Sequence, residues 1–280
     1  MPDYTLYQYL WFFVIYAFIG WCTEVVYAAS KSGKFVNRGF LNGPYCPIYG
    51  FGLVIVISTL TSLKDNLFLL FAGSMILTSA LEVLTGFVLK KVFHQTWWDY
   101  SDQPFNIGGY ICLRFSLIWG IACVLVIYVI HPMIVATISW IPQPLDRIIL
   151  FPLIIIIAVD FAVTVDNINK LNRRLSRLDD LVTRIRDLSD ELGENLAEGT
   201  MELLEIRGKI KVNIDEKRDT LLDNIEKKKE IFTELTSKYE FLLREKSSHT
   251  RLLKAFPNLK STRYAETLQK LKEHYGIFKK

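Results

Sequence analysis

Long apolar segments separated by short polar ones fill the first 165 residues of the chain. A helix needs about 20 apolar residues to cross the hydrocarbon core of a bilayer, and five segments approach or exceed that length. They are residues 6–29, 46–63, 67–89, 109–130 and 148–165. The second and fifth are short, so we expect the second to be tilted or broken and the fifth to continue into water. The pattern predicts an all-α, polytopic membrane protein with five transmembrane helices, formed by residues 1–165.

Beyond residue 165 the apolar residues recur at helical spacing instead of in long runs. Intervals of four and three residues are typical of a coiled-coil seam. One seam consists of Leu171, Leu175, Leu178, Val182, Ile185, Leu192 and Leu196, and a second runs from Leu203 through Ile210 to Leu242. Gly193 and Gly199 predict a break between them. We expect residues 166–246 to form a cytoplasmic coiled coil, either as a helical hairpin or through a second copy in a homo-oligomer.

Charge divides the chain at the same place. Residues 1–165 hold eight basic and eight acidic side chains out of 33 and 29, so the other 25 and 21 lie in residues 166–280. With five spans, the basic loops after the first and third segments share one side with this second half. Because basic loops stay in the cytoplasm, we expect the N-terminus outside and the C-terminus in the cytoplasm.

Residues 247–280 form a basic tail in which apolar and aromatic residues alternate with charges. They carry eight Lys or Arg residues and two Glu residues. A tail tethered to the inner leaflet meets anionic lipid headgroups first, so we expect it to bind the bilayer surface. No RNA- or DNA-binding motif accompanies the charge, and nucleic acid is not an expected partner.

The stretch from residue 38 to residue 50 interrupts the apolar pattern with two prolines and three glycines. These residues disfavour a regular helix. Irregular backbone at a membrane boundary must face protein or water, because hydrocarbon cannot satisfy its polar groups. We interpret residues 38–50 as the broken start of the second membrane helix and as the wall of a site. An ordinary tight interfacial loop is the alternative.

Four ionisable residues lie within the predicted spans: Glu24, Glu82, Arg114 and Asp160. A charge inside a bilayer costs several kcal/mol, so such residues often mark a functional site. All four fall in the cytoplasmic half, which predicts a polar, cytoplasm-facing site that takes up a proton or a cation. Its expected mouth consists of Arg38, Asn42, Gly43, Pro44, Cys46, Pro47, Asn106 and Asp99. The alternative is a structural pair of Glu82 and Arg114, with the other two acids reaching the headgroups.

The sequence offers little for catalysis. It contains no nucleotide-binding P-loop and no hydrolase arrangement on a common side of the membrane. The four cysteines lack metal-finger spacing, so we nominate no catalytic residue, metal or cofactor. Two other functions stay open. One is a membrane-embedded enzyme or lipid-handling protein that uses the intramembrane carboxylates, and the other is a membrane-anchored coiled-coil scaffold.

Four segments resemble a known bacterial family. They are residues 39–50 (GFLNGPYCPIYG), 81–86 (LEVLTG), 97–101 (WWDYS) and 106–114 (NIGGYICLR). They are similar to the putative ABC-transporter permeases of type IV over about residues 7–165. The coiled coil and the tail lie outside this region. The resemblance implies a multi-pass transport component of the bacterial cell membrane, a permease subunit that works with a separate ATPase.

Overall fold

The computed structural model describes residues 4–206, 214–245 and 250–277, which fall into two compact units. The first, here called the membrane unit, contains residues 1–170, 248–263 and 277–280. The second, the extension unit, contains residues 171–247 and 264–276. The predicted tail is therefore divided between the two units.

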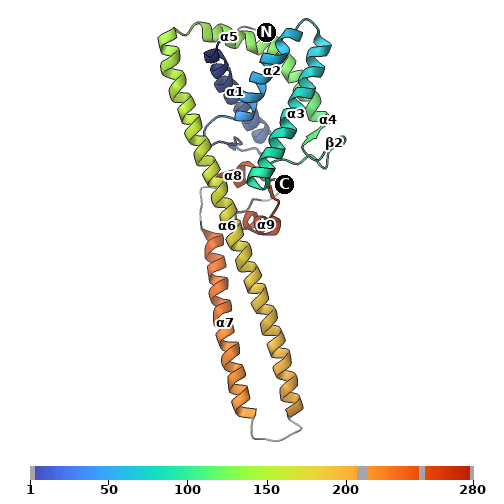
Figure 1. The fold of residues 1–280 in the computed structure, drawn as a ribbon, viewed down its shortest axis with the longest axis vertical. Helices are drawn as coiled ribbons and strands as arrows, with labels where there is room; N and C mark the ends of the chain where they lie inside the picture. The colour runs from blue at the N-terminus through green and yellow to red at the C-terminus, as the bar shows by residue number, and fades with distance from the viewer. Residues whose placement is uncertain (1–3, 207–213, 246–249, 278–280) are drawn as a thin grey trace. The chain divides into compact units, whose positions relative to one another are not determined.

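The membrane unit is built from helices, with four strands of two residues each. Its elements are α1 (Leu6–Ser32), α2 (Pro47–Leu60), η1 (Thr61–Leu63), α3 (Leu67–Phe93), β1 (Gln95–Thr96), β2 (Asn106–Ile107), β3 (Ile111–Cys112), α4 (Leu113–Leu125), the π-helical turn η2 (Val126–Ile130), α5 (His131–Ser139), the first part of α6 (Gln143–Ile206), α8 (Thr250–Ala255) and β4 (Lys260–Ser261). Helix α1 packs against α2, and α3 packs against α4 (Figure 1).

Four helical stretches are long and apolar enough to cross a membrane. They are Leu6–Ser32, Leu67–Phe93, Leu113–Ser139 and Pro144–Glu194. The predicted second span is the shorter apolar stretch Pro47–Leu63, which comprises α2 and η1. The all-α prediction with several membrane helices is therefore confirmed for four spans, and a fifth stays a prediction.

The ends of the long helices follow from local sequence. Thr5 caps α1 through a capping box with Gln8, and Gly33 ends the helix in the left-handed region at φ 66°. Asn66 caps α3 by accepting from the backbone N–H of Leu69. Proline is favoured in the first helical turn because the N–H that it lacks has no partner there, and α2 begins at Pro47.

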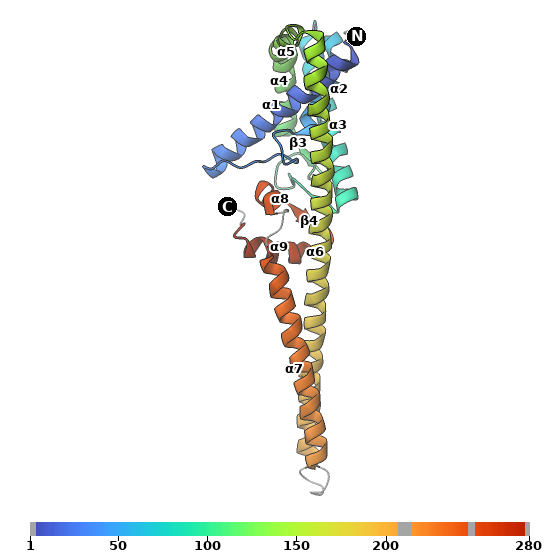
Figure 2. The ribbon, with the colours of Figure 1, turned by 90° about the vertical axis from the view of Figure 1, so that its left-hand side faces the viewer.

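The segment after α4 forms a π-helical turn and a short helix. Residues 131–139 form helix α5, which runs across one end of the bundle in both views (Figures 1 and 2). Pro132 lies in the first turn of α5, where a proline costs little, so it does not prevent a helix. The π-helical turn Val126–Ile130 comes directly before it, and such turns are a common cause of helix bending.

An aromatic cluster forms the core of the membrane unit near His131. Phe12 and Tyr16 of α1 are fully buried and lie in one cluster with Leu41 and Ile57. The hydroxyl oxygen of Tyr16 lies 3.0 Å from Nδ1 of His131, and that of Tyr4 lies 3.0 Å from Nε2. The buried imidazole is therefore hydrogen-bonded on both nitrogens, as a polar group in an apolar core requires.

The extension unit contains the rest of α6, helix α7 (Ile214–Arg244) and helix α9 (Ala265–His274). Lys228 Nζ lies 2.7 Å from Glu191 Oε1, and the Arg174 guanidinium donates to the carbonyl oxygen of Glu245. These contacts join α6 to α7 in antiparallel order within one chain, as the hairpin alternative expects. The predicted break is wrong, because α6 continues through Gly193 and Gly199 to Ile206.

These contacts do not test the second seam or the assembly of two copies through the coiled coil. The seam residue Ile210 and the tail residues 278–280 lie outside the described residues. The buried side chains of α6 in this unit include Leu171, Leu175, Leu178 and Leu181. The first three residues of the first seam are therefore buried against protein, whereas assembly through a second copy stays a prediction.

Close packing of α1 and α2 depends on glycine. A Cβ atom at Gly50 would lie 2.7 Å from the carbonyl oxygen of Phe13, whereas one at Gly52 would have no atom within 4 Å. Alanine gains about 1 kcal/mol of helix propensity over glycine at either position. Overpacking at Gly50 costs about 1–3 kcal/mol, because the backbone oxygen cannot move aside alone.

We therefore expect Gly50→Ala to lower the melting temperature in detergent by about 2–8 °C relative to the matched control Gly52→Ala. Tryptophan fluorescence during thermal unfolding is the measurement. Equal melting temperatures for the two variants would contradict close α1–α2 packing at this position.

Candidate functional site

The structure divides the four predicted intramembrane residues into three places. Glu24 on α1 and Glu82 on α3 belong to one group, here called the carboxylate group together with Arg38, Tyr49 and Tyr100. Asp160 on α6 binds the backbone after α1, and Arg114 stands apart. The expectation that all four meet in one chamber is therefore not met.

Glu24 has both a cationic partner and a hydrogen-bond donor. Arg38 Nε lies 3.3 Å from Glu24 Oε2, and the Tyr49 hydroxyl donates to Oε1 over 2.7 Å. The Glu24 and Arg38 side chains are 27% and 31% exposed, so their charges are only partly solvated. Arg38 of the loop after α1 thus neutralises a carboxylate carried by α1, and the first turn of α2 donates a hydrogen bond to it.

The carboxylate of Glu82 has fewer partners than that of Glu24. The Tyr100 hydroxyl oxygen lies 3.4 Å from Glu82 Oε1, which makes a long hydrogen bond. The other oxygen, Oε2, is enclosed and has no hydrogen-bond partner in the part of the chain that the structure describes. The negative charge of Glu24 also acts on Glu82. An enclosed carboxylate without a cation is costly, so this oxygen is the least satisfied position of the group.

Tyr100 connects the loop after α3 to Glu82. Its ring stacks on Phe115 with centroids 4.9 Å apart. Burial raises the pKa of Tyr100, and Glu82 and, more weakly, Cys112 and Glu24 raise it further. The hydroxyl therefore keeps its proton at neutral pH and can only donate to a carboxylate. The sequence analysis nominated neither Tyr100 nor Tyr49 as a site residue, because spacing does not reveal which hydroxyl meets which acid.

Asp160 accepts hydrogen bonds from the irregular stretch after α1. Its Oδ1 accepts from the backbone N–H and the side-chain amide of Asn42, at 3.1 and 2.7 Å. Its Oδ2 accepts from the backbone N–H of Gly43 at 2.7 Å. Asp160 and Asn42 thus hold one turn together, and this contact explains both residues without a ligand.

Arg114 occupies the first turn of α4 and is exposed. Within residues 4–206, 214–245 and 250–277 it makes no ion pair with Glu82 or another acid. The alternative interpretation of a structural Glu82–Arg114 pair is therefore wrong.

Two of the predicted mouth residues, Cys46 and Pro47, fix the backbone at the start of α2. Cys46 is buried and directly precedes α2, and its N–H donates to the Ala17 carbonyl oxygen over 2.8 Å. Pro47 begins α2, and Pro44 is exposed.

The other two mouth residues stabilise the loop between α3 and α4. The Asn106 side chain donates to the carbonyl oxygens of Ser101 and Gln103, at 3.1 and 2.8 Å. Asp99 accepts from the backbone N–H of Ser101 over 3.0 Å and pairs with Lys260 Nζ at 2.6 Å. Both residues therefore fix loop geometry near Tyr100.

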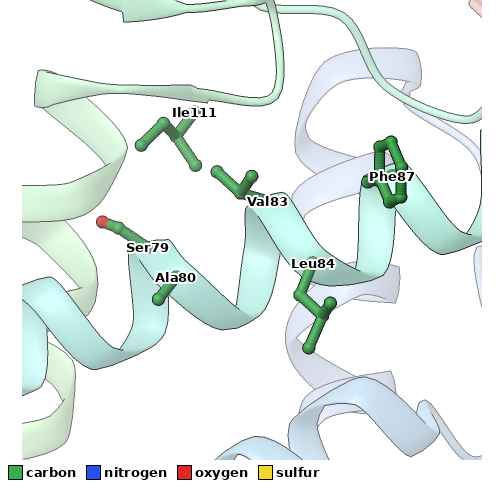
Figure 3. A pocket seen from close by; sticks show the side chains of 6 residues that line it. All are labelled: Ser79, Ala80, Val83, Leu84, Phe87 and Ile111. Atoms are coloured by element: carbon green, nitrogen blue, oxygen red, sulfur yellow. The ribbon is translucent and has the colours of Figure 1, made fainter.

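A hollow of about 390 Å³ lies beside α3 (Figure 3). Its lining is almost entirely apolar and consists of Ser79, Ala80, Val83, Leu84, Phe87 and Ile111. No residue of the carboxylate group lines it, so its surface suits a hydrocarbon chain more than an ion. Within the described ranges, no cluster of three His, Cys, Asp or Glu side chains could hold a metal.

The long apolar helices and the acids among them define a polytopic α-helical membrane protein. The family model for the putative ABC-transporter type IV family matches residues 11–165, more than half of the chain. The chain therefore belongs to this family, as the resemblance implied. No curated protein and no solved structure matches it.

The Asp160 contact makes a local prediction. Asp160→Ala leaves the N–H groups of Asn42 and Gly43 without their acceptor, and hydrogen bonds to a charged group contribute about 1.5–3 kcal/mol. We expect amide hydrogen exchange at both residues to rise about 10- to 100-fold, measured by mass spectrometry. The control is Asp166→Ala on the same helix, which removes an exposed pair with Lys170. Unchanged exchange in Asp160→Ala would refute the contact.

Proposed function

We propose that the chain is a transport component of a bacterial cell membrane, a permease subunit whose intramembrane site is the carboxylate group. The observation that carries this proposal is Glu82, an acid on a membrane helix with one enclosed, unpartnered oxygen. Membership of the putative ABC-transporter type IV family supports transport as the process. The site is narrower than the four-residue chamber, because Arg114 and Asp160 lie outside the group.

Charge balance indicates what this site binds. Two carboxylates, Glu24 and Glu82, share one nearby cation, Arg38. The group therefore carries one uncompensated negative charge inside a medium that disfavours it. A bound proton or a small cation at Glu82 restores neutrality. Tyr49 donates to Glu24 and Tyr100 donates to Glu82, but neither hydroxyl can supply a positive charge.

The loops give the site a route to conformational coupling. Arg38 and Tyr49 belong to the stretch after α1, and Tyr100 belongs to the loop after α3. Displacement of either loop removes a partner from a carboxylate and changes its need for a proton or cation. Such differential stabilisation of two states is what couples a binding event to movement.

The basic loops after α1 and α3 support a cytoplasmic position for this side of the protein, with the N-terminus outside. We propose that a separate ATPase docks here, since the sequence holds no P-loop. The bilayer is the surrounding partner, and the extension unit is a cytoplasmic addition to the family region.

The Glu82 assignment predicts a spectroscopic signal. In detergent or lipid, the wild-type protein should show an infrared band of a protonated carboxyl group, or a carboxylate band that shifts on addition of Na⁺ or K⁺. Glu82→Gln should lose that signal while the protein stays folded, because the amide neither titrates nor binds a cation.

Asp102→Asn, which changes an exposed acid in the same loop region, is the matched control and should retain the signal. Identical spectra of wild type and Glu82→Gln at every pH and salt concentration would rule out the site.

The partner is tested separately. Affinity purification of the tagged full-length chain from its native membrane should recover a protein with ATP hydrolysis activity. Lys90→Glu with Lys91→Glu, which reverses charge at the end of α3, should reduce recovery at least severalfold. Lys64→Glu on the opposite loop is the control. Purification without any associated ATPase activity would contradict this part of the proposal.

A further inference from the structure

A segment close to the C-terminus belongs to the membrane unit. Residues 250–263 lie within this unit although the extension unit precedes them in the chain. They contain four basic residues, Arg251, Lys254, Lys260 and Arg263, and no acidic one. A basic tail at a membrane surface was expected to bind lipid headgroups, but two of these side chains bind protein instead.

Arg251 binds the irregular stretch after α1. Its Nη1 and Nη2 atoms donate to the carbonyl oxygens of Gly39 and Phe40, each over 3.0 Å. The negative charge of Asp160 also acts on Arg251. A guanidinium presents its donors as a planar fork, so it satisfies two adjacent carbonyls that no helix or strand pairs. This contact is specific in geometry as well as in charge.

An aromatic contact follows five residues later. The Phe256 ring meets the Trp97 ring edge to face, with centroids 4.9 Å apart. The centroid of the Trp97 ring in turn lies 5.1 Å from that of the Phe40 ring. The segment therefore bridges two loops of the membrane unit, one after α1 and one after α3. Such aromatic pairs contribute beyond their buried area.

The end of the segment adds a strand to the loop after α3. Strand β4 pairs antiparallel with β1, with Thr96 opposite Lys260 and Gln95 opposite Ser261. The N–H of Thr262 donates to the His94 carbonyl oxygen over 2.9 Å. Strand addition to an exposed edge is a common mode of peptide recognition, in which the backbone supplies affinity and side chains supply specificity.

Lys260 supplies that specificity by pairing with Asp99 at 2.6 Å. The hydrogen bond to Lys260 lowers the pKa of Asp99, and Asp99 raises the pKa of Lys260. The pair stays charged throughout the neutral range, because each partner favours the ionised form of the other.

The contacted residues adjoin the carboxylate group. Gly39 follows Arg38, which pairs with Glu24. Asp99 precedes Tyr100, which donates to Glu82. The segment therefore holds the backbone directly beside both residues that approach the carboxylates from the loops.

We propose that residues 39–40 and 94–99 form a docking surface for a basic segment, and that residues 250–263 of the same chain occupy it as a latch through helix α8 and strand β4. Arg251, Phe256 and Lys260 are the three side chains that recognise the surface. By fixing the two loops, the latch keeps Arg38 and Tyr100 at Glu24 and Glu82. Docking stands on the contacts alone, whereas the effect on the carboxylates rests on the proposed function.

The first test traps the strand pair in the full-length protein. Gln95→Cys combined with Ser261→Cys should form a disulfide on mild oxidation, since the two residues face each other in the register and neither is one of the three recognition side chains. Gel migration and mass spectrometry identify the bond. A bond within one chain supports the latch. A bond between two chains would show that a second copy supplies the segment, and no bond would show that the surface is empty, so either result overturns the proposal.

The second test removes the guanidinium fork. In the double-cysteine protein, Arg251→Ala should slow disulfide formation about tenfold or more, because two hydrogen bonds to a charged group are lost. The matched control, Arg263→Ala, changes an exposed arginine of the same segment and should trap at the original rate. Equal rates for the two variants would overturn recognition by Arg251.

The third test measures whether the latch affects the Glu82 carboxylate. Arg251→Ala in the native-cysteine protein should shift the Glu82 infrared signal, and Arg263→Ala should not. Efficient trapping with an unshifted signal overturns the effect on the site and leaves docking intact. If the wild-type protein lacks the Glu82 signal altogether, the proposed function fails, while the trapping result still decides whether the latch exists.

Discussion

The membrane unit depends on satisfying the polar backbone of one irregular stretch at the boundary of a bilayer. Hydrocarbon offers no hydrogen bonds there, so each exposed N–H or C=O must find a partner in the protein. Asp160 accepts from the turn at Asn42 and Gly43, and Cys46 donates to Ala17. Arg251 binds the preceding carbonyl groups. Partners from α1, α6 and the C-terminal segment therefore converge on fewer than ten residues.

The same stretch explains why acids accumulate nearby without sharing one role. Asp160 is fully engaged by backbone donors and acts as a structural clamp. Glu24 is balanced by Arg38, and its hydrogen bond from Tyr49 fixes its orientation. Glu82 alone keeps an enclosed oxygen without a donor among the described residues. Residue type and depth are similar for the three acids, so their difference arises from the partners that each one finds.

Much of the helical architecture could be predicted from the sequence. Apolar runs mark α1, α3 and α4, and capping signals such as Thr5 and Gly33 set their limits, because both are local properties. The effect of Pro132 depends on its position in the helix, since proline breaks a helix interior but is tolerated in a first turn. Gly193 was misleading, because a solvent-facing helix tolerates one glycine at a cost of about 1 kcal/mol.

The candidate site was predictable only in part. Hydropathy singles out Glu24 and Glu82, since charges stand out against apolar residues. Hydropathy does not reveal that Arg38 pairs with Glu24 or that Arg114 is exposed and makes no ion pair with Glu82 among the described residues, because such contacts depend on how distant segments pack. The pairing of β1 with β4 across more than 160 residues has no periodic signal at all, since each strand has two residues.

The shortness of α2 has a consequence for the surrounding lipid. The stretch Pro47–Leu63 is about 25 Å long at 1.5 Å per residue, whereas the hydrocarbon core measures about 30 Å. A membrane span of this length would have a hydrophobic mismatch with the bilayer, which neighbouring lipids can accommodate by thinning. Tyr49 lies in the first turn of α2 and donates to Glu24, so thinning at that end of the helix would act beside this carboxylate. Acyl-chain length would then influence how well Glu24 is hydrated.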